Sequence, residues 1–302
     1  MESGMFEDEF QNDGSFLHDE FEDGENFEDT ENETSDATDD PKRQGWLVQI
    51  RNLNGEVTER RMWAKQVPKL PVTEQIIVPF KGNQPVGTDI DGLLGQYLGR
   101  LASNHKLLPI SFKKWPEVVK TYKDWVWEKH IKWEPIHEAA ARTSFMMDMG
   151  KKWRENRIRL FHTKFDQTLS REENIRNPPL SIPPTEWAAF IDYRLEEDTT
   201  KKSKQNAANR AKLTINHTGG SKKLKRRSEE IMSQIGKPVS RGTLYIETHK
   251  RRDGSYINEE ARQVCEKIAE IESQGTVPVE VAIDDSLGQV KGAEHYGRVR
   301  AI

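Results

Sequence analysis

The sequence predicts a mainly α-helical protein: a tryptophan-containing helical bundle preceded by a small antiparallel β meander, with a disordered acidic N-terminal tail. Apolar residues recur at helical spacing in three stretches between residues 105 and 197, and each stretch contains a tryptophan. Alternating apolar and polar residues flank an Asn-Gly dipeptide, which is typical of a β-hairpin turn. The first 40 residues hold 17 Asp or Glu and no Lys or Arg.

Residues 1–43 form the acidic tail, which we expect to be disordered because its like charges repel and cannot collapse around a core. Phenylalanines interrupt the acidic residues at Phe6, Phe10, Phe16, Phe21 and Phe27. Two interpretations stay open. The tail is either an acidic-aromatic segment that folds onto a partner or a segment that only adds solubility.

Residues 44–104 are predicted to form the β meander and one helix. Strands are expected near 46–52, 57–63 and 76–80, and Asn54-Gly55 supplies the turn between the first two. A helix is expected from Thr88 to about Ser103, although glycines within it weaken the pattern. Its apolar positions are Leu93, Leu94, Tyr97, Leu98 and Leu101.

Residues 105–200 are predicted to form a helical domain. The first helix is expected to carry one apolar stripe, made of Trp115, Val118, Val119, Tyr122 and Val126. A second helix is expected from about 136 to 165, with Met147 and Trp153 among its apolar positions. A third is expected after Pro183-Pro184, with Thr185 as its N-cap and with Trp187, Phe190, Ile191 and Leu195 buried.

Residues 201–275 are predicted to be a basic helical region, and 276–302 a Gly-containing irregular segment. Between 201 and 227 there are ten Lys or Arg and no Asp or Glu. A helix is expected to start at Ser240, and Asp253-Gly254 should form a turn. The last amphipathic helix is expected over 259–272, where its apolar stripe, with Cys265 in it, offers a surface for self-association.

Metal, cofactor and membrane signals are weak. One cysteine and eight scattered histidines give no metal-ligand spacing, and no glycine-rich phosphate loop or nucleophile motif occurs. We therefore expect no cofactor, no metal and no catalytic residues. No apolar run is long enough for a membrane span, and the single cysteine indicates a reducing compartment.

The basic residues make nucleic acid the expected ligand. Residues 41–302 contain 46 Lys and Arg but only 33 Asp and Glu. Each of these cations that neutralises a DNA phosphate releases a counterion, which favours binding. The expected DNA-binding residues are Lys201, Lys202, Lys204, Asn206, Asn209, Arg210, Lys212, His217, Lys222, Lys223, Lys225, Arg226, Arg227, Lys250, Arg251 and Arg252. The asparagines could pair with adenine edges, and His217 and His249 are expected to bond phosphate or backbone. A solvated surface, or a nuclear import signal at 221–227, is the alternative.

Several segments together resemble one known family. They are Gln84-Pro-Val-Gly87, Gly150-Lys-Lys-Trp-Arg154, Pro183-Pro-Thr-Glu-Trp187, Ser203-Lys-Gln-Asn-Ala-Ala-Asn-Arg-Ala-Lys212, His217-Thr-Gly-Gly-Ser221, Thr248-His-Lys-Arg-Arg-Asp-Gly254, and Leu287-Gly followed by Tyr296-Gly-Arg-Val-Arg300. In this order, over about 46–300, they resemble the plant Ptta/En/Spm transposase family. The run Lys222 to Arg227 departs from it, being more basic than the family pattern.

The resemblance implies a nuclear protein of plant DNA transposons that binds duplex DNA of the transposon ends. It is closer to a DNA-binding accessory product than to a strand-cutting one. The acidic tail would then modulate DNA affinity or recruit a transposase or transcription partner. Two other functions stay open: a metal-dependent transposase that cleaves and transfers strands, which would need clustered carboxylates, and a transcriptional regulator derived from a transposon.

Overall fold

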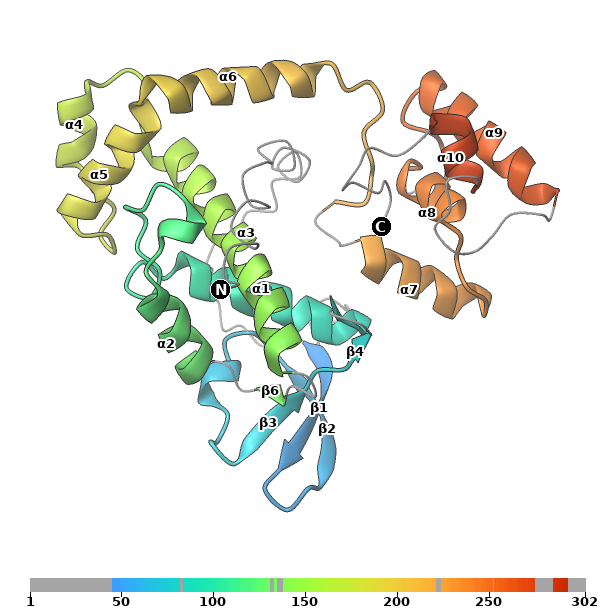
Figure 1. The fold of residues 1–302 in the computed structure, drawn as a ribbon, viewed down its shortest axis with the longest axis horizontal. Helices are drawn as coiled ribbons and strands as arrows, with labels where there is room; N and C mark the ends of the chain where they lie inside the picture. Colours follow the sequence, from blue (N-terminus) through green and yellow to red (C-terminus); the bar gives the residue numbers. More distant parts are fainter. Residues whose placement is uncertain are drawn as a thin grey trace, which may run out of the picture. The chain divides into compact units, whose positions relative to one another are not determined.

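A computed structural model describes residues 45–81, 84–130, 133–134, 138–220, 224–251, 253–274 and 285–292. The expected fold class is confirmed, since helices dominate the structure and a small sheet lies near the start of the described chain (Figure 1). The expected disordered tail, residues 1–43, lies outside the described residues. The chain divides into two compact units, whose described parts are residues 45–200 and 201–292. We call them the N-terminal and the C-terminal unit.

The expected antiparallel strands are confirmed. They are β1 (Trp46–Asn52), β2 (Val57–Met62) and β3 (Glu74–Ile77). β1 pairs with β2 antiparallel, and Gly55 closes their turn with a φ of 81°, which glycine adopts without strain. A short strand, β6 (Trp133–Glu134), pairs parallel with β3 and was not expected from the sequence.

The order of the strands corrects the expected meander. In a meander the second strand would lie in the middle, whereas the order here is β2-β1-β3-β6. β1 takes the centre because Val48 and Ile50 both face the core, while only Met62 of β2 is buried. The more polar strand therefore lies at the edge, where its outer backbone groups stay accessible to water.

One hydrophobic core holds the sheet and the first helices together. Those helices are α1 (Thr88–Ser103), α2 (Lys120–His130) and α3 (Glu138–Lys164). α1 packs against β1 and α3 (Figure 1), and Ile50, Leu93 and Trp153 all lie in the shared core. Residues on both sides of position 104 contribute to it, so that position does not separate two cores.

The helix expected around Trp115 begins later than its apolar pattern indicates. A 3-10 turn (Trp115–Glu117) precedes α2, and Val118 interrupts the helical backbone with a ψ of 120°. Val118 and Val126 are buried, but Val119 is 47% exposed, so the expected continuous stripe is wrong. The 3-10 turn brings Trp115 against Trp153, with ring centroids 5.7 Å apart. The apolar side chain thus reaches the core without the continuous helix that was expected.

The other two helices of the expected bundle are confirmed, with local corrections. Met147 on α3 faces solvent and is 57% exposed, because the core side of this helix runs through Phe145 and Met149 instead. α5 (Pro184–Leu195) buries Trp187 as expected, but its N-cap is Pro183 rather than Thr185. Leu195, expected to be buried, is 40% exposed at the end of that helix.

A short helix that was not expected, α4 (Arg171–Arg176), precedes α5 and is capped by Ser170. The Ser170 side chain accepts from the backbone N–H of Glu173, and the Glu173 carboxylate accepts from the backbone N–H of Ser170 at 2.8 Å. This is a capping box, which satisfies two backbone donors that a helix start leaves without partners.

The C-terminal unit is built from helices. They are α6 (Glu197–Ala211), in which the chain passes between the two units, α7 (Leu224–Ile235), α8 (Arg241–Thr248), α9 (Glu259–Ser273) and α10 (Ser286–Lys291). α8 starts at the expected N-cap, Ser240, and the expected turn at Asp253-Gly254 is present. α10 corrects the expectation of an irregular segment for residues 286–291, and the rest of 276–302, apart from residues 285 and 292, lies outside the described residues.

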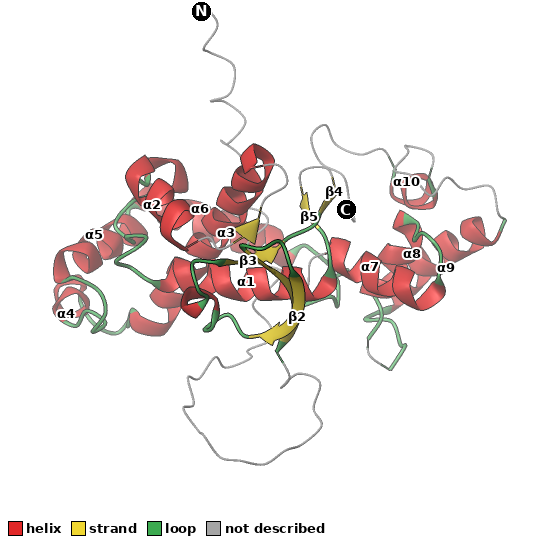
Figure 2. Cartoon of the chain, turned by 90° about the horizontal axis from the view of Figure 1, so that it is seen from below, coloured by secondary structure: helices red, strands yellow, loops and turns green. Residues whose placement is uncertain are grey.

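The apolar face of α9 is already covered within the unit, which corrects the expected self-association through 259–272. Cys265 and Ile268 are buried against Tyr245 of α8 and Leu287 of α10. Figure 2 shows α8, α9 and α10 gathered in one helical cluster, with α7 beside α8. The face of α9 that remains outside is charged, since Arg262 pairs there with Glu259 and Glu266. Cys265 is a core residue, as expected.

The packing of α1 on β1 predicts opposite effects for two glycine substitutions on one helix. A Cβ at Gly92 would lie 2.6 Å from the ring of Trp46, which a hydrogen bond from its Nε1 to Gln96 Oε1 (3.1 Å) holds in place. Gly92→Ala is expected to lower the free energy of unfolding by about 1 to 3 kcal/mol through overpacking. Gly99 has open space at that position, so Gly99→Ala is expected to raise it by about 0.5 to 1 kcal/mol. Urea unfolding followed by tryptophan fluorescence measures both, and equal shifts in the same direction would contradict the close contact.

Candidate nucleic-acid interface

The helix α6 carries six of the first seven expected DNA-binding residues, and the seventh, Lys212, follows directly after it. Its sequence favours a helix without help from a core: Glu197 and Asp198 lie in the first turn and Arg210 in the last, as the helix dipole prefers. Alanines at its C-terminal end add helix propensity. None of its side chains is buried, so this helix presents its length to solvent.

Basic and amide side chains share one side of α6. The positions are three or four residues apart and therefore lie along one face of the helix. We call this face the α6 stripe, and its members are Lys201, Lys204, Gln205, Ala208, Asn209 and Lys212. All of them are exposed. Lys212 lies in the turn that continues the helix, where its N–H donates to Asn209 O at 3.2 Å.

Three lysines on or directly after α6 keep their charge available. Among the described residues, no carboxylate lies within ion-pair distance of Lys202, Lys204 or Lys212. Asn206 and Arg210, which were also expected to bind DNA, point to the neighbouring side of the helix and are partly buried. The stripe is therefore the part of the expected site that the structure brings together most clearly.

The cations of α7 differ from those of α6. Arg226 Nε and Arg227 Nη1 each lie 3.5 Å from a carboxylate oxygen of Glu230. The sequence between 201 and 227 contains no acid, but Glu230 lies one helical turn further on and shares its charge with both arginines. This corrects the expectation of basic residues without counter-charge for this part of the run. Lys225 is partly buried on the same helix, and Lys222 and Lys223 lie outside the described residues.

The turn between α8 and α9 holds two more of the expected residues. Lys250 and Tyr256 form an isolated antiparallel bridge, and Arg251 N–H donates to Ser255 O at 2.7 Å. Lys250 Nζ lies 3.4 Å from Glu247 Oε1, while the Arg251 guanidinium is exposed and donates to Ile257 O at 3.2 Å. Arg252 lies outside the described residues. A tight, hydrogen-bonded turn thus presents Arg251 to solvent.

The segment after α6 is bound to this turn by hydrogen bonds from one backbone N–H and from two side chains. Thr218 N–H donates to Thr248 O at 2.5 Å, and Thr218 Oγ1 donates to the Lys250 carbonyl. Asn258 Nδ2 donates to Thr214 O at 2.6 Å. Thr218 and Thr248, which are 30 residues apart in sequence, therefore lie side by side. His217 Nδ1 accepts from Gly219 N–H at 3.2 Å.

His249 has a structural role. It is buried, and it stacks on Tyr245 with ring centroids 3.8 Å apart. Burial lowers the pKa of His249 from 6.5 to about 4, despite the hydrogen bond with Tyr245 O that favours protonation. The ring is thus neutral, and its Nδ1–H donates to that carbonyl at 2.7 Å. The expected backbone hydrogen bond is confirmed for this histidine.

A buried polar network fixes the three helices behind the turn, and sequence reasoning missed it. Arg241 Nε lies 2.7 Å from Asp285 Oδ2, with both side chains 3% exposed. Glu272 accepts from Ser240, Thr243 and Ser286, the first at 2.5 Å. The Asp285 N-cap of α10 leaves a signal in the sequence, namely Asp before a short helix that starts with Ser and Leu. A buried Arg241 leaves none.

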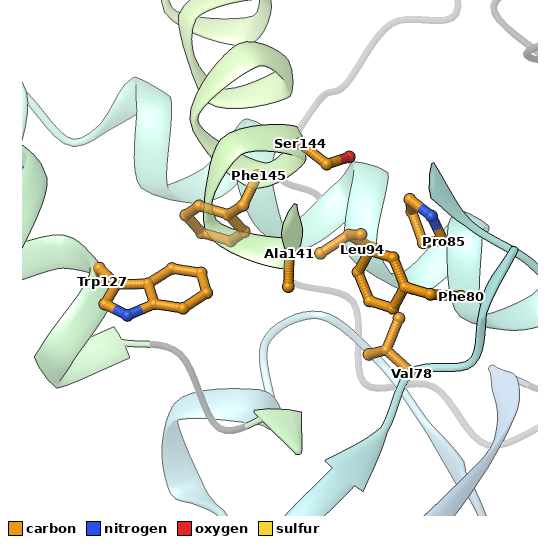
Figure 3. Close-up of a pocket in the computed structure, with 8 residues that line it drawn as sticks. All are labelled: Val78, Phe80, Pro85, Leu94, Trp127, Ala141, Ser144 and Phe145. Atoms are coloured by element: carbon orange, nitrogen blue, oxygen red, sulfur yellow. The ribbon is translucent and has the colours of Figure 1, made fainter. Parts of the chain in front are cut away.

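The N-terminal unit contains an apolar pocket. Side chains from α1, α2, α3 and the strands β4 (Phe80–Lys81) and β5 (Gln84–Pro85) point into it (Figure 3). Its lining is Val78, Phe80, Pro85, Leu94, Trp127, Ala141, Ser144 and Phe145. A single hydroxyl and no charged group face this pocket, which therefore does not suit a phosphate.

Two further findings concern only the part of the chain that the structure describes. No three His, Cys, Asp or Glu side chains converge there in a way that could hold a metal ion. No described helix combines the length and the apolar character that crossing a bilayer requires.

The fold and the α6 stripe define a mainly helical protein with an exposed basic helix. Residues 183–302 match the model of the plant transposase family (Ptta/En/Spm). The resemblance is thereby confirmed from Pro183 onward, and it relates the chain to DNA transposons. Comparison with curated proteins and with solved structures found no significant match to either.

Proposed function

We propose that this protein binds duplex DNA of a plant DNA transposon in the nucleus, through the α6 stripe and without catalysis of its own. The observation that carries the proposal is an exposed helix with no buried side chain, where Lys201, Lys204 and, in the turn that continues the helix, Lys212 share one face. That helix lies within the residues that match the family model. Proteins that move or regulate DNA transposons act on the DNA of the element, which makes a polyanion the ligand to expect.

The physical basis is counterion release. Each lysine that neutralises a DNA phosphate frees a condensed cation, so the observed affinity falls steeply as salt concentration rises. We expect Arg251, which the turn after α8 presents to solvent, to add one further phosphate contact. The arginines of α7 are weaker contributors because they share Glu230.

Neutralising the stripe is expected to weaken DNA binding and to flatten its salt dependence. The variant carries Lys201→Gln, Lys204→Gln and Lys212→Gln. Three lost phosphate contacts should reduce the slope of log affinity against log salt by about 3. Fluorescence anisotropy with a labelled duplex, measured at several salt concentrations with the full chain, gives both quantities.

The matched control makes the same change of net charge elsewhere. Lys65, Lys69 and Lys106 are exposed in the N-terminal unit, and their triple exchange to Gln should leave the slope close to that of the unsubstituted protein. If both triple variants had equal effects, the lysines of the stripe would contribute to DNA binding only through the net charge of the protein and not through their position. An unchanged affinity in the stripe variant would overturn the proposed site.

A second candidate, strand cleavage by a metal-dependent transposase, is favoured by the family to which residues 183–302 belong. It requires carboxylates that hold two metal ions near the scissile phosphate. Incubation of the full chain with supercoiled DNA that carries transposon ends, in magnesium or manganese, tests it. Metal-dependent nicking would replace the proposal of a purely binding protein.

A further inference from the structure

Two amides on α6 are joined to each other. Gln205 Nε2 donates to Asn209 Oδ1 at 3.0 Å, and both side chains are exposed. They are four residues apart, so they lie one above the other on the helix surface. The lysines of the stripe flank them, with Lys201 and Lys204 toward the N-terminal end and Lys212 toward the other.

The mutual hydrogen bond leaves a defined set of groups for a ligand. A carboxamide has two N–H donors and one carbonyl oxygen with two lone pairs. After the bond is made, Gln205 keeps its oxygen and one N–H, and Asn209 keeps both N–H groups. The bond also restricts rotation of both amides, so that less conformational entropy is lost when a ligand binds.

This set matches one base better than the others. In the major groove adenine presents an acceptor, N7, beside a donor, the N6 amino group, and an amide can bond both at once. Guanine presents two acceptors there, cytosine presents an amino donor, and thymine presents an acceptor and a methyl group. The amide oxygen can therefore accept from the N6 amino group of adenine. At the same place guanine presents O6, a second acceptor, which would repel the amide oxygen.

The shape of α6 permits the approach. The major groove is wide enough to admit an α-helix, and no side chain of α6 is buried in the protein. Ala208 lies between the two amides on the stripe and extends only a methyl group. A helix of 15 residues is roughly 22 Å long, so the flanking lysines can reach phosphates while the amides face the bases.

We propose that α6 enters the major groove of duplex DNA and that Gln205 and Asn209 select adenine there. The inference rests on the proposed function, because the lysines of the same stripe must first hold the duplex. It adds a division of labour: the lysines supply affinity for any sequence, and the amide pair supplies the choice of base.

The test separates the two roles. Sites are selected from random duplex DNA with the full chain, and the adenine of the enriched motif is then replaced by 7-deazaadenine, which lacks the N7 acceptor but still pairs with thymine. The expected result is an enriched motif that contains adenine, and weaker binding after this replacement but not after the same replacement at a flanking adenine.

The variant Gln205→Ala with Asn209→Ala is expected to retain the affinity for arbitrary duplex within about twofold. Its preference for the motif should fall by roughly 5- to 150-fold, the range for one bidentate base contact. Gln263→Ala removes an exposed amide from α9 and should change neither quantity. Alanine favours helices, so α6 should stay folded in the double variant.

The outcomes are distinguishable. If the lysine variant loses DNA binding but the double alanine variant still selects the same motif, the adenine inference is overturned and the proposed function stands. An enriched motif without adenine would likewise overturn the adenine inference and leave the proposed function standing. If the lysine variant binds DNA unchanged, the proposed function fails and this inference fails with it.

Discussion

Replacing Arg241 by methionine is expected to lower the free energy of unfolding of the C-terminal unit by about 3 to 5 kcal/mol. Arg241 holds Asp285 through two contacts, Nε to Oδ2 at 2.7 Å and Nη2 to Oδ1 at 2.9 Å. Both side chains are 3% exposed. Without the arginine, the buried Asp285 carboxylate loses both of these contacts, and the backbone N–H of Gly288, which donates to it at 2.7 Å, cannot replace its hydration.

The eight tryptophans lie between positions 46 and 187, which allows the two units to be followed separately. Tryptophan fluorescence reports the N-terminal unit, and far-ultraviolet circular dichroism reports the helices of both. In urea, Arg241→Met should move the dichroism transition of the C-terminal unit to lower concentration and leave the fluorescence transition in place.

Two further variants decide what the effect means. Arg241→Met combined with Asp285→Asn should recover part of the loss, because asparagine removes the unpaired charge and still caps α10. Lys267→Met, at an exposed position of α9, should change stability by less than about 0.5 kcal/mol. A loss below about 1 kcal/mol in Arg241→Met would mean that the ion pair does not hold α8 to α10.

Periodicity predicted the long helices well because it records which residues face the core. α1 has the bounds expected from its leucines, and α3 lies within the expected range. Around Trp115 the same pattern predicted a continuous helix, which is wrong. A 3-10 turn followed by an extended Val118 also brings Trp115 and Val118 to the core. The apolar pattern determines the side that is buried but not the path of the chain.

Short helices and strand order escaped for a different reason. α4 and α10 have six residues each, which is too short for a periodic pattern, although Ser170 and Asp285 mark their starts as caps. The central place of β1 depends on which strand has two residues facing α1, and that is a tertiary property.

Charge in the candidate site was readable only in part. The lysines of α6 and the spacing of Gln205 and Asn209 are visible in the sequence, but the sharing of Glu230 by Arg226 and Arg227 depends on α7 being a helix. The network around Glu272 joins residues that belong to three helices and lie far apart in the sequence, so it could not be predicted from a local sequence pattern.

Acidification from pH 6.5 to pH 4 is expected to remove about 3 kcal/mol of stability from the C-terminal unit through His249 alone. Burial lowers the pKa of this histidine from 6.5 to about 4. Between these values the unfolded chain binds a proton that the folded chain does not bind, so protons favour unfolding and stability falls as the pH falls. Above pH 6.5 both states are neutral and below pH 4 both are protonated, so the histidine contributes no slope outside this interval.

His249→Phe tests this contribution because phenylalanine keeps an aromatic ring against Tyr245 but cannot take up a proton. The variant should lose the hydrogen bond to Tyr245 O, at a cost of about 1 kcal/mol near neutral pH, and should become relatively more stable as the pH falls. The difference in unfolding free energy between variant and unsubstituted protein, measured by urea titrations from pH 4 to pH 7.5, isolates the histidine from carboxylates that titrate in both. A flat difference for His249→Phe would show that the ring accepts its proton in the folded unit, and the neutral, buried hydrogen bond to Tyr245 would then be wrong.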